Sequence, residues 1–332
     1  MRVLVIGAGS IGERHVRCFQ QTGRATVSVC EIDSALRQRM CTRYGLEEAF
    51  EDLEEALLRP PDVAVVCTPA HLHIPMSIRL AEAGVHTLIE KPLSTSLEGI
   101  DRLRDSAEAG KTLTAVAYVY RAHPILASMR RSLLEGRFGK PLQLVALCGQ
   151  NFPFHRPAYR EIYYKDRATG GGAVQDALTH ILNAAEWLLG PITELAADSA
   201  HKALDGVDVE DTVHVVARHQ DVLASYSLNQ YQAPNEIVIT VVCEDGTARF
   251  EMHRNRWRWM SQPQTEWHDE SQSLERDTLF VRQANSFLDT VEGKAAPLCS
   301  LEEGIQTLFV NLAILRASGT REWISVAPHG GS

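Results

Sequence analysis

The chain has 332 residues, which is enough for two domains with hydrophobic cores. Its composition of 45% hydrophobic and 23% charged residues is ordinary for a globular protein, and the net charge of −9 argues against nucleic acid or an anionic membrane as a partner. No apolar run reaches the roughly 18 residues that a membrane span needs.

The seven cysteines are scattered and include no Cys-x-x-Cys pair. This spacing argues against a disulfide framework or a zinc site, so we expect no metal. Met1 and Arg2 lead directly into a predicted strand, which leaves no room for a signal peptide. We therefore expect the protein to be cytoplasmic.

The first motif joins a strand to a helix. Residues 3–6 form a β-branched apolar run, typical of a strand buried on both faces, and residues 13–21 predict a helix. Between them stands the sequence Gly7-Ala8-Gly9-Ser10-Ile11-Gly12. A Gly-x-Gly-x-x-Gly between strand and helix is the dinucleotide-binding fingerprint, in which Gly7 permits a tight turn, Gly9 lets a pyrophosphate approach and Gly12 lets the helix pack on the strand. The helix N-terminus then offers unpaired N–H groups to the phosphates.

Glu31 follows a second predicted strand, residues 25–30. It lies about 20 residues beyond the fingerprint, where a carboxylate accepts hydrogen bonds from the adenosine ribose. A carboxylate there repels a 2′-phosphate, so the sequence favours NAD over NADP. Arg37 and Arg39 in the next predicted helix keep NADP open.

Helices and strands alternate through residues 1–121. We predict helices at 35–44, 53–58, 71–83 and 96–109, and strands at 63–67, 85–89 and 113–117. This alternation predicts an α/β domain of the Rossmann type with a doubly wound parallel sheet. We expect residues 1–121 to be the dinucleotide-binding domain.

Two of these strands end in polar residues. Thr68 and Pro69 break one strand, where Thr68 is placed to hydrogen-bond a cofactor and His73 to face the nicotinamide ribose, although a histidine there is more often polar surface. Another strand ends in Glu90-Lys91-Pro92 and so brings an ammonium group to the carboxyl edge of the sheet, where ligands bind in open α/β folds. An isolated lysine in such a place is usually a surface residue.

Residues 122–332 show a different pattern. A helix at 124–134 precedes predicted strands at 141–148, 193–200, 212–218, 222–228, 237–243 and 247–253. Helices at 279–291 and 301–317 and a short strand at 323–326 end the chain. We expect an α+β domain with a largely antiparallel open sheet, whose alternating residues leave one face either solvated or available for an oligomer contact.

Residues 150–169 form a long connection rich in aromatic and cationic side chains. Connections of this length inside a compact domain are usually functional or disordered, and the aromatic content argues against disorder. Rings and cations suit a pocket for a polyhydroxylated or carboxylated ligand. We expect Tyr159, Tyr163 and Tyr164 to contribute to substrate binding.

The glycine run 170–172 precedes a predicted helix at 173–189. Asp176 and His180 stand at i and i+4, so on an α-helix they share a face. An aspartate hydrogen-bonded to a histidine orients the ring and stabilises the imidazolium, which is a general-base arrangement. Alone, such a pair is more often a surface ion pair, but the glycines make a close approach of a ligand plausible.

Taken together, the fingerprint, Glu90-Lys91-Pro92 and the segment from Gly170 to His180 resemble the Gfo/Idh/MocA oxidoreductases, the family of glucose–fructose oxidoreductase and inositol 2-dehydrogenase. The similarity runs over nearly the whole chain, and it includes Thr68-Pro69 with His73 and the segment Tyr120-Arg121-Ala122-His123-Pro124. The resemblance implies an enzyme that moves hydride between nicotinamide and a hydroxyl-bearing carbon of a sugar, inositol or related polyol.

By this resemblance Lys91, Asp176 and His180 form the catalytic set and also contact substrate, with a Lys–Pro bond that is often cis. Glu90 and Arg121 fall with the cofactor-binding residues and Tyr120 with the substrate-binding residues. The C-terminal sheet is expected to form a homodimer or homotetramer. Two departures stand out: Asn183 replaces a frequent aspartate, and Ala122 a frequent aromatic residue.

Two other interpretations stay open. One is a non-catalytic NAD(P)-binding sensor or regulatory protein with the same fold, which has no need to keep Lys91, Asp176 and His180 together. The other is an enzyme that retains its cofactor tightly and uses hydride transfer only transiently.

Overall fold

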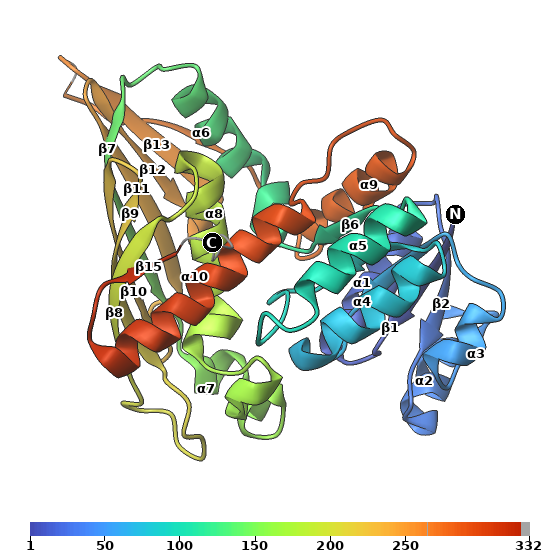
Figure 1. The fold of residues 1–332 in the computed structure, drawn as a ribbon. Coiled ribbons are helices and arrows are strands. Elements are labelled where there is room, and N and C mark those ends of the chain that lie inside the picture. Colours follow the sequence, from blue (N-terminus) through green and yellow to red (C-terminus); the bar gives the residue numbers. More distant parts are fainter. Residues whose placement is uncertain (264, 327–332) are drawn as a thin grey trace. The chain divides into compact units, whose positions relative to one another are not determined.

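The computed structural model describes residues 1–263 and 265–326 (Figure 1). They divide into two compact units. The first contains Met1–Ala122 and Glu275–Ile305, and the second contains His123–Leu274 and the chain from Gln306 onward. The sequence predicts a single division near residue 121 and does not predict the return of residues 275–305 to the first unit.

The first unit is built on a six-stranded parallel sheet with strand order β3-β2-β1-β4-β5-β6. This order is that of the dinucleotide-binding doubly wound fold, so the predicted fold class is confirmed. Its strands are β1 (Arg2–Ile6), β2 (Thr26–Cys30), β3 (Ala49–Phe50), β4 (Val63–Val66), β5 (His86–Ile89) and β6 (Thr114–Val116). Its helices are α1 (Ser10–Gln21), α2 (Ser34–Tyr44), α3 (Leu53–Leu57), α4 (His73–Glu82), α5 (Ile100–Gly110) and α9 (Thr278–Val291).

Helices cover both faces of this sheet, because the strands carry apolar residues on both sides. One face packs against Val16 and Phe19 of α1 and Met40 of α2, and the other against Ala56 of α3 and Leu80 of α4. The sheet is therefore the centre of a two-sided core, as a continuous apolar run in a parallel strand predicts.

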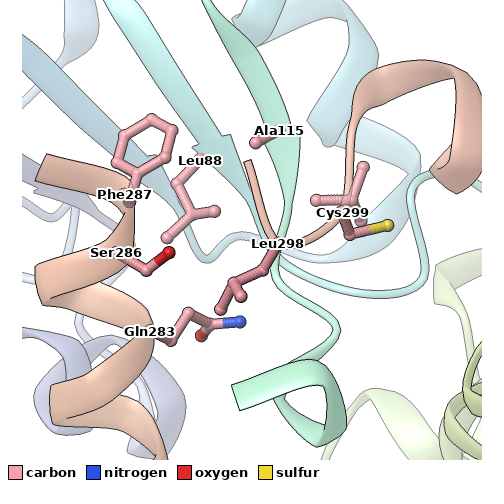
Figure 2. Close-up of a pocket in the computed structure, with 8 residues that line it drawn as sticks. Leu88, Ala115, Gln283, Ser286, Phe287, Leu298 and Cys299 are labelled. Carbon is pink, nitrogen blue, oxygen red and sulfur yellow. The ribbon is translucent and has the colours of Figure 1, made fainter. Parts of the chain in front are cut away.

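Helix α9 explains why residues 275–305 belong to the first unit. Its residues Ala284, Phe287 and Leu288 are buried in the same core as β1 and β2. Figure 2 shows the helix beside Leu88 and Ala115 of the sheet, around a cavity of about 10 Å³. That volume holds one water at most, so this cavity is not a nucleotide or sugar site.

The second unit contains a nine-stranded sheet with strand order β14-β13-β12-β11-β7-β10-β9-β8-β15. Neighbouring strands are antiparallel except for β7 and β10, which pair in parallel. The strands are β7 (Pro141–Gly149), β8 (Glu194–Ala200), β9 (Thr212–His219), β10 (Val222–Asn229), β11 (Glu236–Cys243), β12 (Gly246–Glu251), β13 (Arg256–Ser261), β14 (His268–Ser271) and β15 (Ile324–Ser325). Helices α6 (Pro124–Leu134), α7 (Phe152–His155) and α8 (Thr179–Leu189) belong to this unit, and α10 (Leu301–Thr320) spans the division at residue 305.

One face of the nine-stranded sheet is covered by helices. Helix α6 contacts β12 and β13, and α8 contacts β7 (Figure 1). Strand β9 alternates strictly, with Val213, Val215 and Ala217 buried and Val216 about half exposed. The alternation in the sequence is thus confirmed as a sheet with one packed and one open face.

Residues 150–169 are not one irregular loop. They form α7 and three short 3₁₀ turns around a small core of their own. Phe152, Tyr159 and Tyr164 pack there against Leu204, Val207 and Val209. These three buried rings therefore help to stabilise the segment.

Candidate functional site

The fingerprint loop follows β1 at the carboxyl edge of the parallel sheet. Gly7 has a φ of 86° and its N–H donates to the carbonyl of Cys30 over 2.8 Å. A Cβ at Gly12 would overlap the carbonyl oxygen of Gly7, so glycine is required for α1 to pack against the loop. At Gly9, in contrast, a Cβ would meet no atom of the described residues within 4 Å, and none of their side chains caps α1. The loop therefore leaves space and donor groups where a pyrophosphate binds, which fits NAD.

Glu31 is tied to this loop. Its Oε2 accepts the N–H of Ala8 over 2.7 Å, and its Oε1 accepts the N–H of Asp33 over 3.0 Å. Arg37 donates to the carbonyl of Glu31 over 2.5 Å and to Glu51 over 3.2 Å, while Arg39 is exposed. The carboxylate thus lies beside the fingerprint, and the Arg37 guanidinium is occupied by the Glu31 carbonyl and the Glu51 carboxylate.

Thr68 and Pro69 follow β4 at the same edge of the sheet, and Thr68 is partly exposed. His73 is only 1% exposed. Its Nδ1 lies 2.9 Å from the carbonyl oxygen of Pro92 and its Nε2 2.8 Å from that of Thr68. Burial lowers the pKa of this ring. His73 therefore links the turn after β4 to the turn after β5. A buried ring in this position is better suited to holding the two turns together than to contacting a ribose.

Glu90, Lys91 and Pro92 follow β5, and the Lys91–Pro92 peptide is cis. Glu90 is buried, and its Oε2 accepts the N–H of Lys91 over 3.0 Å. Lys91 is partly exposed at the carboxyl edge of the sheet. Its ammonium group is thus carried by a turn whose backbone is hydrogen-bonded to a buried carboxylate.

Tyr120 and Arg121 lie in a 3₁₀ turn, Val119–Ala122, which follows β6. Arg121 is buried, donates to the carbonyl of Leu298 over 3.0 Å and pairs with Glu303. Arg121 therefore anchors the segment after α9 to the first unit. Tyr120 is partly exposed.

In the second unit the glycine run packs tightly against the protein itself. A Cβ at Gly171 would overlap the carbonyl of Tyr164, and one at Gly172 would overlap the Glu210 carboxylate. Glu210 is 1% exposed, pairs with Arg167 over 2.8 Å and accepts the N–H of Val174 over 3.1 Å. The glycines thus serve close packing at the start of the helix, whereas the sequence suggested close approach of a ligand.

Asp176 does not lie on a regular α-helix. Residues Val174–Leu178 form a π-helical turn, and α8 begins only at Thr179. The Oδ1 of Asp176 accepts the Tyr163 hydroxyl over 2.6 Å, and its Oδ2 lies 4.0 Å from Arg156. Because a π turn changes the spacing of residues around a helix, the i,i+4 rule for an α-helix does not apply directly to Asp176 and His180. Tyr163 is a partner of Asp176 that the sequence did not indicate.

His180 lies in the first turn of α8 and is partly exposed. One turn further, the amide of Asn183 donates to Thr307 over 3.0 Å, and Thr307 donates to Glu186 over 2.6 Å. Asn183 is therefore part of a buried polar network that joins α8 to α10.

Tyr159 and Tyr164, two of the three tyrosines predicted to bind substrate, are buried. Their side chains are 1% and 0% exposed in the small aromatic core, and their hydroxyls bond to Asp205 and Gln230. Both rings are thus packing residues. Tyr163 alone of the three tyrosines is exposed, at 36%.

The described part of the chain offers neither a cluster of metal ligands nor a membrane-spanning helix. Within residues 1–263 and 265–326 there is no group of three or more His, Cys, Asp or Glu side chains that could hold a metal ion. None of the helices described there has both the length and the apolar character needed to cross a membrane.

Comparison with known proteins identifies the family. Residues 1–118 match the oxidoreductase family with an NAD-binding Rossmann fold, and residues 126–249 match the GFO/IDH/MocA C-terminal domain. The chain belongs to the Gfo/Idh/MocA oxidoreductases. The predicted resemblance is therefore confirmed, and with it an NAD-binding fold.

Individual members of this family are distant from the chain. Levoglucosan dehydrogenase of Pseudarthrobacter phenanthrenivorans is 28% identical over 59% of the chain, which spans only 53% of that relative. The 1,5-anhydro-D-fructose reductase of Ensifer adhaerens is 25% identical over 95% of the chain and 96% of the relative. A solved levoglucosan dehydrogenase in complex with NADH and levoglucosan superposes with a TM-score of 0.89 over 99% of the chain and 100% of that protein, at 21% identity.

Proposed function

We propose that the protein is an NAD-dependent oxidoreductase that transfers hydride between nicotinamide and a hydroxyl-bearing carbon of a sugar, inositol or related polyol. The main support is that the nucleotide fingerprint and the turn bearing Lys91 stand on strand ends of one parallel sheet. Sugar names among the relatives, levoglucosan dehydrogenase and 1,5-anhydro-D-fructose reductase, support the substrate class.

We assign cofactor binding to the fingerprint and its neighbours. Gly7, Gly9, Ser10, Ile11 and Gly12 would hold the pyrophosphate, and Glu31 the adenosine ribose. NAD supplies, when bound, the two-electron hydride acceptor. The contacts of Arg37 with Glu31 and Glu51 support NAD over NADP, because they engage the guanidinium that would otherwise suit a 2′-phosphate.

The proposed catalytic set is Lys91, Asp176 and His180. An alcohol loses hydride only as its hydroxyl proton leaves, so a base is required. His180 suits this role because the unperturbed pKa of histidine, about 6.5, lies near neutrality. Asp176 orients the base, Tyr163 fixes the Asp176 carboxylate by its hydrogen bond, and Lys91 stabilises the developing alkoxide.

We propose residues 1–121, together with residues 275–305 that return to the same unit, as the cofactor domain, and the remainder of residues 122–332 as the domain for substrate binding and oligomer contacts. A homodimer or homotetramer through the open face of the nine-stranded sheet is supported by Leu147, Val216 and Leu223, each about half exposed on adjacent strands. Apolar side chains grouped on a sheet face favour association. The double variant Val216→Lys, Leu223→Lys should then reduce the mass measured by light scattering to that of a single chain.

The proposed location is the cytoplasm. Its support is that the cysteines stand as thiols, and burial raises the pKa of Cys18, Cys30 and Cys148 to about 12 in each case. Buried thiols of this kind suit a reducing compartment.

Hydride tracing tests the activity. The protein is incubated with a metabolite extract and NADH deuterated at the transferring position, with Lys91→Ala as the control. A polyol or sugar heavier by one deuterium, absent from the control, would identify the substrate and support the role of Lys91. Binding of NADH without transfer of deuterium to any metabolite would favour the nucleotide sensor instead.

A further inference from the structure

His15 and Glu90 form a buried contact that joins two motifs 75 residues apart. His15 lies on α1, the helix that starts in the fingerprint, and its Nε2 is 2.7 Å from Oε1 of Glu90. The two side chains are only 1% and 6% exposed. Because a carboxylate oxygen accepts, Nε2 carries the hydrogen of this bond. The Nδ1 of His15 has no hydrogen-bond partner among the described residues, so the contact with Glu90 is the ring's link to other polar groups there.

The imidazole is held in this orientation by neighbouring rings. It meets Phe280 of α9 edge-on with the centroids 5.6 Å apart, and it lies 6.2 Å from Phe19 of its own helix. A buried ring with two aromatic neighbours has little room to turn, and here its Nε2 meets Glu90. His15 therefore offers a rigid donor to the carboxylate.

The second oxygen of Glu90 accepts the N–H of Lys91 over 3.0 Å. The chain His15–Glu90–Lys91 thus runs from the fingerprint helix to the backbone of the lysine turn. On the other side of Lys91, the carbonyl of Pro92 meets the buried ring of His73 at 2.9 Å. The backbone is therefore contacted on one side of the lysine by Glu90, which itself meets His15, and on the other side by the imidazole of His73.

Stability alone gives a poor reason for the His15–Glu90 pair. Burying two polar side chains costs a desolvation free energy that their mutual attraction only partly offsets. Apolar residues of similar size in the same places often give equal or higher stability. A pair of this kind is better explained by what it positions.

We propose that His15 is a positioning residue, which holds the Glu90 carboxylate so that Glu90 fixes the backbone of Lys91 at the end of β5. The inference rests on the proposed function, because a fixed Lys91 matters only if Lys91 acts in hydride transfer. It assigns His15 no contact with substrate.

The first test measures the exchange of the Lys91 amide with solvent and requires no enzymatic activity. Six lysines are present, so protein labelled with ¹⁵N-lysine gives few amide signals, and Lys91→Ala assigns the signal of Lys91. In His15→Leu we expect the Lys91 amide to exchange with solvent about 10-fold faster, since its acceptor is no longer held. His15→Gln places an amide donor near Nε2 and should restore slow exchange.

The second test measures the rate of hydride transfer and can be carried out once a substrate is known. His15→Leu should lower the rate about 10–10²-fold at saturating substrate, with KM and NADH affinity unchanged, as expected for a displaced catalytic group. In the Lys91→Ala background the same substitution should have no further effect, because it acts through that lysine. His15→Gln should keep most of the rate.

A matched control is His86→Leu. His86 lies at the other end of β5, and its Nδ1 accepts the N–H of Leu113 over 2.9 Å. This variant loses a histidine contact in the same sheet and should leave Lys91 exchange unchanged. If His15→Leu does not fold, His15→Asn, whose amide is too short to reach Glu90, takes its place.

Three results would overturn the proposal: unchanged Lys91 exchange in His15→Leu, equal behaviour of the Leu and Gln variants, or parallel acceleration at Lys111 and Lys294, which would mean general loosening of the first unit. Failure of the proposed function looks different. In that case wild-type protein transfers no deuterium, while Lys91 exchange still responds to His15.

Discussion

The carboxyl edge of the six-stranded sheet and the segment from Tyr163 to His180 both carry candidate catalytic residues, but they hold them by different means. At the sheet edge, residues such as Lys91 follow directly from buried strands, and short side-chain contacts fix the turns. In the second unit, Asp176 stands on a π turn preceded by glycines that pack against Tyr164 and Glu210. One region depends on regular structure and the other on local packing.

This difference matters for what a substitution does. At the sheet edge the strands are held by a two-sided core, so a change in a turn residue should affect function before stability. In the second region the residues that hold the Asp176 turn in place are also the residues that pack the segment together. There, function and stability should fall together.

The largest expected effect belongs to Lys91→Ala. Loss of the ammonium group should lower the rate of hydride transfer about 10²–10⁴-fold, the usual contribution of acid–base assistance, while NADH binding and the unfolding midpoint stay near wild type. Stopped-flow absorbance at the nicotinamide band measures the rate, fluorescence titration measures NADH binding, and urea unfolding measures the midpoint. Asp176→Asn should lower the rate of hydride transfer less than Lys91→Ala does if Asp176 only orients His180. Full activity of Lys91→Ala would remove the lysine from the catalytic set.

The sheet edge is largely predictable from the sequence. A short apolar run followed by glycines or by Glu90-Lys91-Pro92 indicates a buried strand and its exposed end, and the strands lie within one or two residues of the predicted ranges. Helix α6 begins and ends at the predicted residues because Pro124 fixes its start. The two-residue strand β3 has no periodicity, so the sequence does not predict it.

The second region is not predictable in the same way. No residue pattern distinguishes the π turn at Val174–Leu178 from an α-helix, because the turn depends on contacts such as that between Val174 and Glu210, 36 residues away. The burial of Tyr159 and Tyr164 likewise depends on Leu204, Val207 and Val209, which are distant in the sequence. The placement of α9 in the first unit also arises from long-range packing.

Within the first region, substitutions at two glycines of the fingerprint should affect different properties, one the stability of the fold and the other the affinity for NADH. Gly12→Ala should lower the free energy of unfolding by about 1–3 kcal/mol or more, because its Cβ overlaps the carbonyl of Gly7. Gly9→Ala has open space and an ordinary φ of −59°, so its stability should be near wild type. Its NADH affinity should fall about tenfold, roughly 1.4 kcal/mol, because the methyl group occupies the phosphate side of the loop. Equal NADH affinity in Gly9→Ala and wild type would argue against this cofactor position.

Glu210→Ala tests the coupling of function and stability in the second region. It removes the acceptor of Val174 N–H and the partner of Arg167, so it should lower the free energy of unfolding of this unit by about 2 kcal/mol and also slow hydride transfer. All five tryptophans lie in the second unit, so their fluorescence follows its unfolding.

The matched control for this variant is Glu194→Ala, whose partner Arg218 is 2.8 Å away with both side chains 46% exposed. A surface pair of this kind is worth about 0–1 kcal/mol, so the control should change little. If Glu210→Ala and Glu194→Ala behave alike, Glu210 does not support the Asp176 turn.

The smallest effect concerns the pH dependence of the second unit. Burial of His219 lowers its pKa to about 4, and the neutral ring lies 2.7 Å from the carbonyl of Gly190 and 2.5 Å from the Tyr226 hydroxyl. The unfolded chain binds a proton below about pH 6.5 while the folded unit does not, so stability is full above that pH and is lost as the pH falls towards the folded value. Between about pH 7 and 5.5 this should cost about 1 kcal/mol, measured by urea unfolding followed by tryptophan fluorescence. His219→Gln should remove that part of the acid sensitivity and leave Lys91 amide exchange unchanged, whereas an unaltered pH dependence would assign the loss to other groups.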